Sequence, residues 1–315
     1  MEQNTSHRVG ELMSPTDWLL DSDPAIRWQA MRDLTDETDE AVSTERARVA
    51  TEGWGARLLA LQGPDGQWGG GTYFPEGLAT TPTLLLLRDM GLDPKGDEAQ
   101  RAIALVRANS RWEHEGQPYF EGEVEPCING MAVAIGAYFG EDIRGIVDRL
   151  LTEQMADGGW NCEQENGSIR GSFHSTISVL EGLLEYERAP GGRPDVTAAR
   201  LRGQDYLLER GMIRRLSTNE VVDEAWTQFS YPTHWHYDVL RGLDYMRAAS
   251  VVPDERVTEA IELVERRRGE DGLWLLDNFH EGELHFAMDE GVGKASRWNT
   301  LRALRVLRWH KKSSG

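Results

Sequence analysis

The chain contains only two cysteines, Cys127 and Cys162, and both precede the same histidine, His174, by 47 and 12 residues. Thiolate sulfur and imidazole nitrogen are common zinc ligands, and a catalytic zinc site uses three protein ligands and leaves a fourth position open. The three residues therefore predict a zinc site, provided that the fold brings their segments together. The alternative is that both cysteines are buried structural residues and that His174 lies at a capped helix end. The residue types alone leave this choice open.

Histidines recur at the corresponding place further along the chain. When the two segments are aligned on their V-L-x-G-L phrases, His234 stands opposite His174 and His236 stands opposite Thr176. We therefore expect His234 and His236 at the same cavity mouth as His174. His236, with Tyr237 next to it, is a candidate for substrate contact or proton transfer, because histidine titrates near neutral pH. Aromatic packing or a surface cap is the alternative.

Two charged residues complete the candidate set. Glu163 lies in the loop that leads to His174, and Arg297 begins the last predicted helix. We expect both at the cavity mouth, as candidate catalytic residues. His280 and His285 lie in the preceding loop, five positions apart, which is not the spacing of a metal-binding pair on a helix.

A repeated turn marks the elements that must position these residues. The phrase D-G-x-W occurs at 65–68, 157–160 and 271–274, so its copies start 92 and 114 residues apart. Asp-Gly makes a tight turn because glycine accepts positive φ, and we expect the tryptophan to pack the turn onto a neighbouring helix. The spacing fits helical hairpins of roughly 46–57 residues, with degenerate turns at 112–116 and 217–220.

Two kinds of helix alternate between these turns. Segments that are apolar nearly all round are predicted to be buried on both sides, and amphipathic segments are predicted to lie outside them. The buried helices are expected to start near Thr81, Pro126, Ser172, Thr233 and Arg297. The amphipathic helices are expected at 98–108, 143–154, 197–209 and 257–267.

An inner ring of helices inside an outer ring is an α/α toroid. We therefore predict an all-α fold, a toroid of five to six helical hairpins that forms a single domain over residues 1–315. Residues 14–53, with Pro24 at a helix start, are predicted to form an extra N-terminal helical hairpin. Residues 311–315 are predicted to form a disordered tail.

The D-G-x-W turns resemble the QW repeats of squalene-hopene and oxidosqualene cyclases, which also occur in degenerate form in the β subunits of protein prenyltransferases. This similarity to the terpenoid cyclase and prenyltransferase superfamily covers residues 54–309 and implies the α/α toroid. Class II cyclases protonate their substrate with the central aspartate of a D-x-D-D segment, which this chain lacks. The nearest acidic phrases are 21–23 and 36–40, and Asp23, before Pro24, is predicted to cap a helix. The resemblance therefore does not imply a class II cyclase.

The prenyltransferase branch implies a metal site. In that family the zinc ligands come from a D-x-C phrase at the start of one inner helix and from a histidine one repeat later. The phrases V-E-P-C at 124–127 and S-F-H-S-T at 172–176 resemble these two in the same order. The resemblance implies Zn²⁺ bound by Cys127 and His174, with Glu125 standing where the family has aspartate. Cys162 has no counterpart in the family, and it is the alternative third ligand. A distance of more than about 6 Å between the Cys127 sulfur and the His174 ring would exclude a common ion.

The charge of the chain limits its partners. Thirty-four basic and 53 acidic residues give a net charge of −19, which repels nucleic acids and anionic membrane surfaces. No apolar run is long enough for a membrane span, and no signal peptide is evident at the start, so we expect a cytoplasmic protein. The expected partner is a small-molecule substrate, hydrophobic or cationic, and the sequence shows no sign of an obligate helical partner subunit.

Three functions remain open at this point. The first is a zinc-dependent transferase, lyase or hydrolase that acts on a small molecule in the central cavity. The second is an isoprenoid cyclase or isoprenoid-binding protein without a metal. The third is a non-catalytic binding toroid, because one fold hosts many functions. Zinc in the purified protein would select the first.

Overall fold

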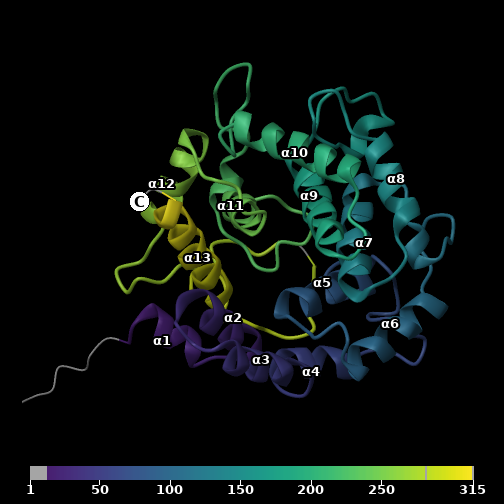
Figure 1. The fold of residues 1–315 in the computed structure, drawn as a ribbon, viewed down its shortest axis with the longest axis horizontal. Helices are drawn as coiled ribbons and strands as arrows, with labels where there is room; N and C mark the ends of the chain where they lie inside the picture. The colour runs from purple at the N-terminus through teal and green to yellow at the C-terminus, as the bar shows by residue number, and fades with distance from the viewer. Residues whose placement is uncertain (1–12, 281, 314–315) are drawn as a thin grey trace, which may run out of the picture.

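The computed structural model describes residues 13–280 and 282–313 and is all-helical. Within these residues no β-strand forms, and extended segments meet only in isolated β-bridges. The helices form two concentric sets when the molecule is viewed along its shortest axis (Figure 1). The outer set is α1 (Pro15–Leu20), α3 (Asp39–Ala47), α4 (Gly53–Ala60), α6 (Asp97–Asn109), α8 (Arg144–Thr152), α10 (Pro194–Glu209) and α12 (Thr258–Arg266). The inner set is α2 (Pro24–Leu34), α5 (Thr80–Met90), α7 (Pro126–Phe139), α9 (Phe173–Arg188), α11 (Val239–Ala248) and α13 (Arg297–Ser313).

This arrangement agrees with the predicted α/α toroid. Five consecutive outer–inner pairs run from α4–α5 to α12–α13, and α1–α2 adds a sixth. The predicted N-terminal hairpin, residues 14–53, contains α1, α2 and α3, and its helix α2 belongs to the inner set and packs against α13. Asp23 caps α2 by accepting a hydrogen bond from the Ala25 amide, as its place before Pro24 predicts.

Two predicted boundaries differ from the structure. The helix expected to start near Thr233 starts instead at Val239, because Asp238 is its N-cap and accepts a hydrogen bond from the Arg241 amide at 2.7 Å. Residues 233–237 therefore belong to a loop, in which His234 has a positive φ of 46°. At the other end, α13 continues to Ser313, so 311–313 are helical; residues 314–315 lie outside the described residues.

The D-G-x-W turns share one set of hydrogen bonds. Each tryptophan is fully buried, and its indole N–H donates to the carbonyl ten residues earlier, at 2.7–2.8 Å. Each tryptophan amide donates to a threonine hydroxyl near the start of the next inner helix. In the turn at 157–160, the Gln154 side chain also donates to the carbonyls of Gly158 and Ala199. Each turn thus fixes where an outer helix ends and where the next inner helix begins.

Helices α7 and α9 pack so closely that their backbones touch. A Cβ on Gly130 would lie 2.6 Å from backbone atoms of Ser178 and Val179, and a Cβ on Gly182 would lie 2.4 Å from the Gly130 carbonyl oxygen. Only glycine leaves room for this approach. Because the two helices start at the same end, the close contact brings the residues at their N-termini, Cys127 and His174, to one place.

Candidate functional site

A cavity of about 470 Å³ opens at the N-terminal ends of α7 and α9. Four of the predicted metal ligands, Glu125, Cys127, Cys162 and His174, line it, as does Glu163. The rest of its wall is largely aromatic or acidic. It includes Tyr73, Phe74, Glu76, Trp112, Glu113, Glu123 and Trp235.

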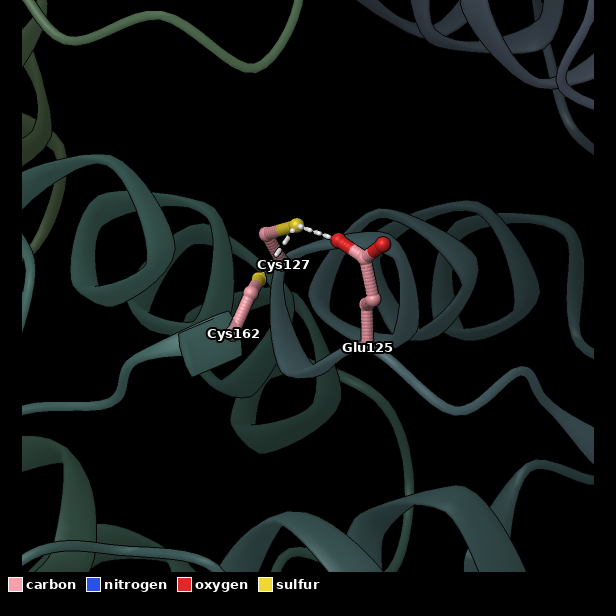
Figure 2. A group of neighbouring side chains, drawn as sticks. All are labelled: Glu125, Cys127 and Cys162. Atoms are coloured by element: carbon pink, nitrogen blue, oxygen red, sulfur yellow. Dashed lines mark hydrogen bonds between the residues drawn. The ribbon is translucent and has the colours of Figure 1, made fainter. Parts of the chain in front are cut away.

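Three of these residues form a compact group of metal-binding atoms. One carboxylate oxygen of Glu125 and the sulfurs of Cys127 and Cys162 all lie within 4.8 Å of one another, and this is the one such group among the described residues. Figure 2 shows the Cys127 sulfur between the other two side chains. It lies 2.9 Å from the Cys162 sulfur and 3.4 Å from Glu125 Oε2. Two segments 35 residues apart thus supply one site.

The segment that carries Glu125 and Cys127 is held by side chains behind it. Asn129, fully buried, donates to the Glu123 carbonyl at 2.7 Å and accepts from the Glu123 amide at 2.8 Å. Arg149 of α8 donates to the carbonyls of Glu123 and Val124, both at 2.8 Å. The sequence places Asn129 just after Cys127 but gives no sign of Arg149, because its contact is made from the neighbouring hairpin.

The two thiols differ in acidity. The hydrogen bond with Cys162, burial and the nearby Glu125 carboxylate raise the pKa of the Cys127 thiol well above its usual range. The hydrogen bond with Cys127 lowers the pKa of the Cys162 thiol. The Ser175 hydroxyl, 3.3 Å from the Cys162 sulfur, lowers it further. The first thiolate of the pair therefore forms on Cys162, the less buried of the two.

His174 is oriented away from a ligand role. Its Nδ1 accepts a hydrogen bond from the Tyr237 amide at 2.8 Å, and its ring packs edge-on against Trp226 and Trp235. Burial lowers the pKa of His174 to about 4, so the ring is neutral at pH 7. A neutral ring with a lone pair on Nδ1 carries its proton on Nε2, so Nε2 is a donor and has no lone pair for a metal. In this state His174 is therefore not the ligand that the sequence predicts.

The other predicted histidines occupy different places. The His236 ring is stacked between Trp235 and His280, with ring centroids 3.8 and 3.6 Å away, and its centroid lies 6.0 Å from that of His174. Because these rings enclose it, His236 is absent from the wall of the cavity. His234 lines a smaller adjacent cavity beside Trp235. The alignment with His174 fails because 233–237 form a loop instead of a helix start.

Two predicted catalytic side chains do not reach the cavity. The Tyr237 phenol is buried and donates to the Met212 carbonyl at 2.5 Å, so only its backbone amide serves the site, by orienting His174. The Arg297 guanidinium packs over the Trp18 ring of α1, 4.2 Å from its centroid, and donates to the Trp18 carbonyl. Glu163 does lie on the cavity wall, where its carboxylate accepts a hydrogen bond from Asn166.

The partly buried histidines make the stability of the fold sensitive to acid. Burial, with His280 and Arg241 nearby, lowers the pKa of His234 to about 4, whereas the unfolded value is about 6.5. Between these values the unfolded chain binds the proton and the folded chain does not, so the free energy of unfolding falls as the pH drops from about 6.5 to about 4. His234→Asn, which suits a positive φ, should make this fall shallower. Urea unfolding at several pH values measures it.

The matched control for this experiment is His114→Asn, because His114 is exposed. We expect the control to keep the pH dependence of the parent protein. Parallel curves for the parent and His234→Asn would show that His234 takes up no extra proton on unfolding and would contradict the prediction.

The comparisons with known proteins do not identify the site. No protein-family model matches the sequence, and no curated protein resembles it at a significant level. Over the described ranges 13–280 and 282–313, none of the helices combines the length and apolar character that a membrane span requires. The chemistry of the site therefore has to be inferred from its geometry.

Proposed function

We propose that this protein is a zinc-dependent enzyme in which Glu125, Cys127 and Cys162 hold the ion at the mouth of a helical toroid. The observation that carries the proposal is the approach of one carboxylate oxygen and two sulfurs to within 4.8 Å of one another on a cavity wall. Three protein ligands with one position left for substrate is the pattern of catalytic zinc sites. The resemblance of the D-G-x-W turns to those of terpenoid cyclases and prenyltransferases supports the same reading.

The residues present fit the ion. Two sulfurs bound to one tetrahedral zinc at ~2.3 Å stand roughly 3.8 Å apart, so the present 2.9 Å separation has to widen slightly. Cys162 can supply that movement, because it begins a short 3₁₀ turn, Cys162–Gln164, that is mostly exposed. Among the described residues, no Lys or Arg lines the cavity. A bound cation would therefore balance the negative charge of the two thiolates and the Glu125 carboxylate.

The charge of the site selects the substrate. Five glutamates line the cavity, which disfavours anionic substrates and favours uncharged or cationic ones. The aromatic wall, with Tyr73 and Trp235, provides apolar contact and cation–π attraction. When bound, zinc would supply a Lewis acid, and because two thiolates and one carboxylate give the site a net negative charge, it would polarise an uncharged substrate only weakly. The Nε2–H of His174 would donate a hydrogen bond to the substrate.

The test is elemental analysis of protein purified without added metal, combined with a count of free thiols. We expect about one zinc per chain and two cysteines that become reactive towards a thiol reagent only after the metal is chelated. Protein without zinc but with two free thiols would reject the proposal and favour isoprenoid binding or a non-catalytic toroid. A Cys127–Cys162 disulfide in the purified protein would also reject it.

A further inference from the structure

A second cavity, of about 320 Å³, lies at the other end of the inner helices. It is lined by the C-terminal halves of α5, α7 and α9, by α2, α11 and α13, by Arg46 of α3, and by Tyr231 and Thr233 of the loop before α11. His174 and Arg188, at the two ends of α9, are separated by 14 residues, or roughly 21 Å along a helix. Of these two residues, His174 lines the first cavity but not the second, and Arg188 lines the second but not the first. The two cavities are therefore separate sites.

The electrostatic character of this cavity is opposite to that of the protein as a whole. Eight arginines and four carboxylates line it. Asp33 and Asp238 do not line the cavity but pair with arginines of its wall. When these two carboxylates are counted with the four of the wall, the guanidinium groups still exceed the carboxylates by two. Among the described residues, Arg46 and Arg188 have no carboxylate partner and bond only to carbonyl or hydroxyl oxygens. A chain with a net charge of −19 thus concentrates positive charge in one cavity.

Two buried polar groups of the wall have no hydrogen-bond partner. The Tyr231 hydroxyl and the Trp298 indole N–H are both unpaired, although the residues are only 7% and 1% exposed. Both residues line the cavity, and their rings stack with centroids 4.3 Å apart. A buried donor without a partner is unfavourable by roughly 1–3 kcal/mol, so two such donors side by side on a cavity wall are suited to hydrogen-bond an acceptor in the cavity.

We propose that this cavity binds a small oxyanion, a polycarboxylate or a phosphate ester, that accepts hydrogen bonds from Tyr231 and Trp298. The excess guanidinium charge would balance the anion, and Arg302, 5% exposed and bound to the Ser230 carbonyl, is a fixed donor on the same wall. The indole N–H can only donate, which excludes a cation as its partner. The site goes beyond the zinc chemistry proposed above, because it uses different residues and the opposite ligand charge.

The experiment measures binding of inorganic phosphate, pyrophosphate and citrate by calorimetry, with sodium chloride of equal ionic strength as the blank. We expect at least one of the three anions to bind, and the preferred one shows whether the site favours phosphate or carboxylate. Tyr231→Phe and Trp298→Phe keep the stacked rings and remove the unpaired donors. Loss of about tenfold in affinity in either variant supports the proposal. In the absence of anion, Tyr231→Phe should melt at the same temperature as the parent protein or higher.

Tyr245→Phe is the matched control. The Tyr245 ring lines the same cavity, but its hydroxyl is already bonded to Gln204 Oε1 at 2.9 Å. We expect this variant to be less stable than the parent protein and to bind the anion equally well. The proposal is overturned if none of the three anions binds, if both donor variants bind as the parent does, or if Tyr245→Phe loses as much affinity as they do. Zinc content should stay unchanged in all three variants, so the two proposals can fail independently.

Discussion

Replacing Cys127 with serine should lower the affinity of the chain for zinc at least about a hundredfold. A serine hydroxyl does not ionise at neutral pH and is a poor zinc ligand, and loss of groups that merely support ligands already costs 10–100-fold. Cys162→Ser and Glu125→Gln should act in the same direction, because all three ligand atoms lie within 4.8 Å of one another. The measurement is competition for zinc against a chromogenic chelator. Far-ultraviolet circular dichroism should stay that of the parent, because the helices pack without the ion.

His174→Gln is the informative control in this series. The Nδ1 of His174 is occupied by the Tyr237 amide, so the ring has no lone pair to give to a metal. We therefore expect His174→Gln to keep its zinc and to lose turnover of whichever substrate is found. Loss of zinc equal to that of Cys127→Ser would show that the ring rotates to bind the ion, as the resemblance to prenyltransferases implies.

Truncating Trp160 to alanine should lower the free energy of unfolding by about 3–5 kcal/mol. The side chain is fully buried, and its indole N–H donates to the Leu150 carbonyl at 2.7 Å, so the variant leaves both a cavity and an unpaired buried carbonyl. A loss of this size is a large part of the total stability of a domain. Urea unfolding monitored by circular dichroism measures it.

Two further variants make the Trp160 result interpretable. Trp160→Phe keeps most of the ring, so its free energy of unfolding should fall by less than that of Trp160→Ala. It can be measured in place of the alanine variant if that variant does not fold. Trp235→Ala removes an indole that is only partly buried and lines the first cavity, so it should also lose less than Trp160→Ala. Equal losses for Trp160→Ala and Trp235→Ala would show that the turn tryptophan has no special structural role.

The sequence by itself determined the features that depend on local chemistry. The turns at 65–68, 157–160 and 271–274 follow from Asp-Gly geometry and a following tryptophan, and all three occur in the structure with the same indole hydrogen bond. The buried and amphipathic helices follow from apolar periodicity, which is a property of each segment alone. Asp23 caps a helix because its neighbour Pro24 fixes the start. The all-α fold and most helix positions were therefore predictable.

The tertiary structure alone decided which of the candidate residues meet. Gly130 and Gly182 let α7 and α9 touch, and Cys162 is hydrogen-bonded to Ser175 of α9, so its sulfur lies 2.9 Å from that of Cys127. No spacing along the chain encodes that contact. The His174 ring is turned by the Tyr237 amide from 63 residues away, which decides its tautomer and removes it from the predicted ligand set. The long side chain of Arg297 reaches α1 instead of the cavity.

The arginine-lined cavity was the least predictable feature. Its charged residues come from five inner helices and α3, and within each helix taken alone they are ordinary polar positions. Only closure of the ring sets them around one cavity, together with the unpaired donors of Tyr231 and Trp298. Periodicity reports how one helix divides between core and solvent, whereas the charge of a cavity is a sum over helices that are distant in sequence.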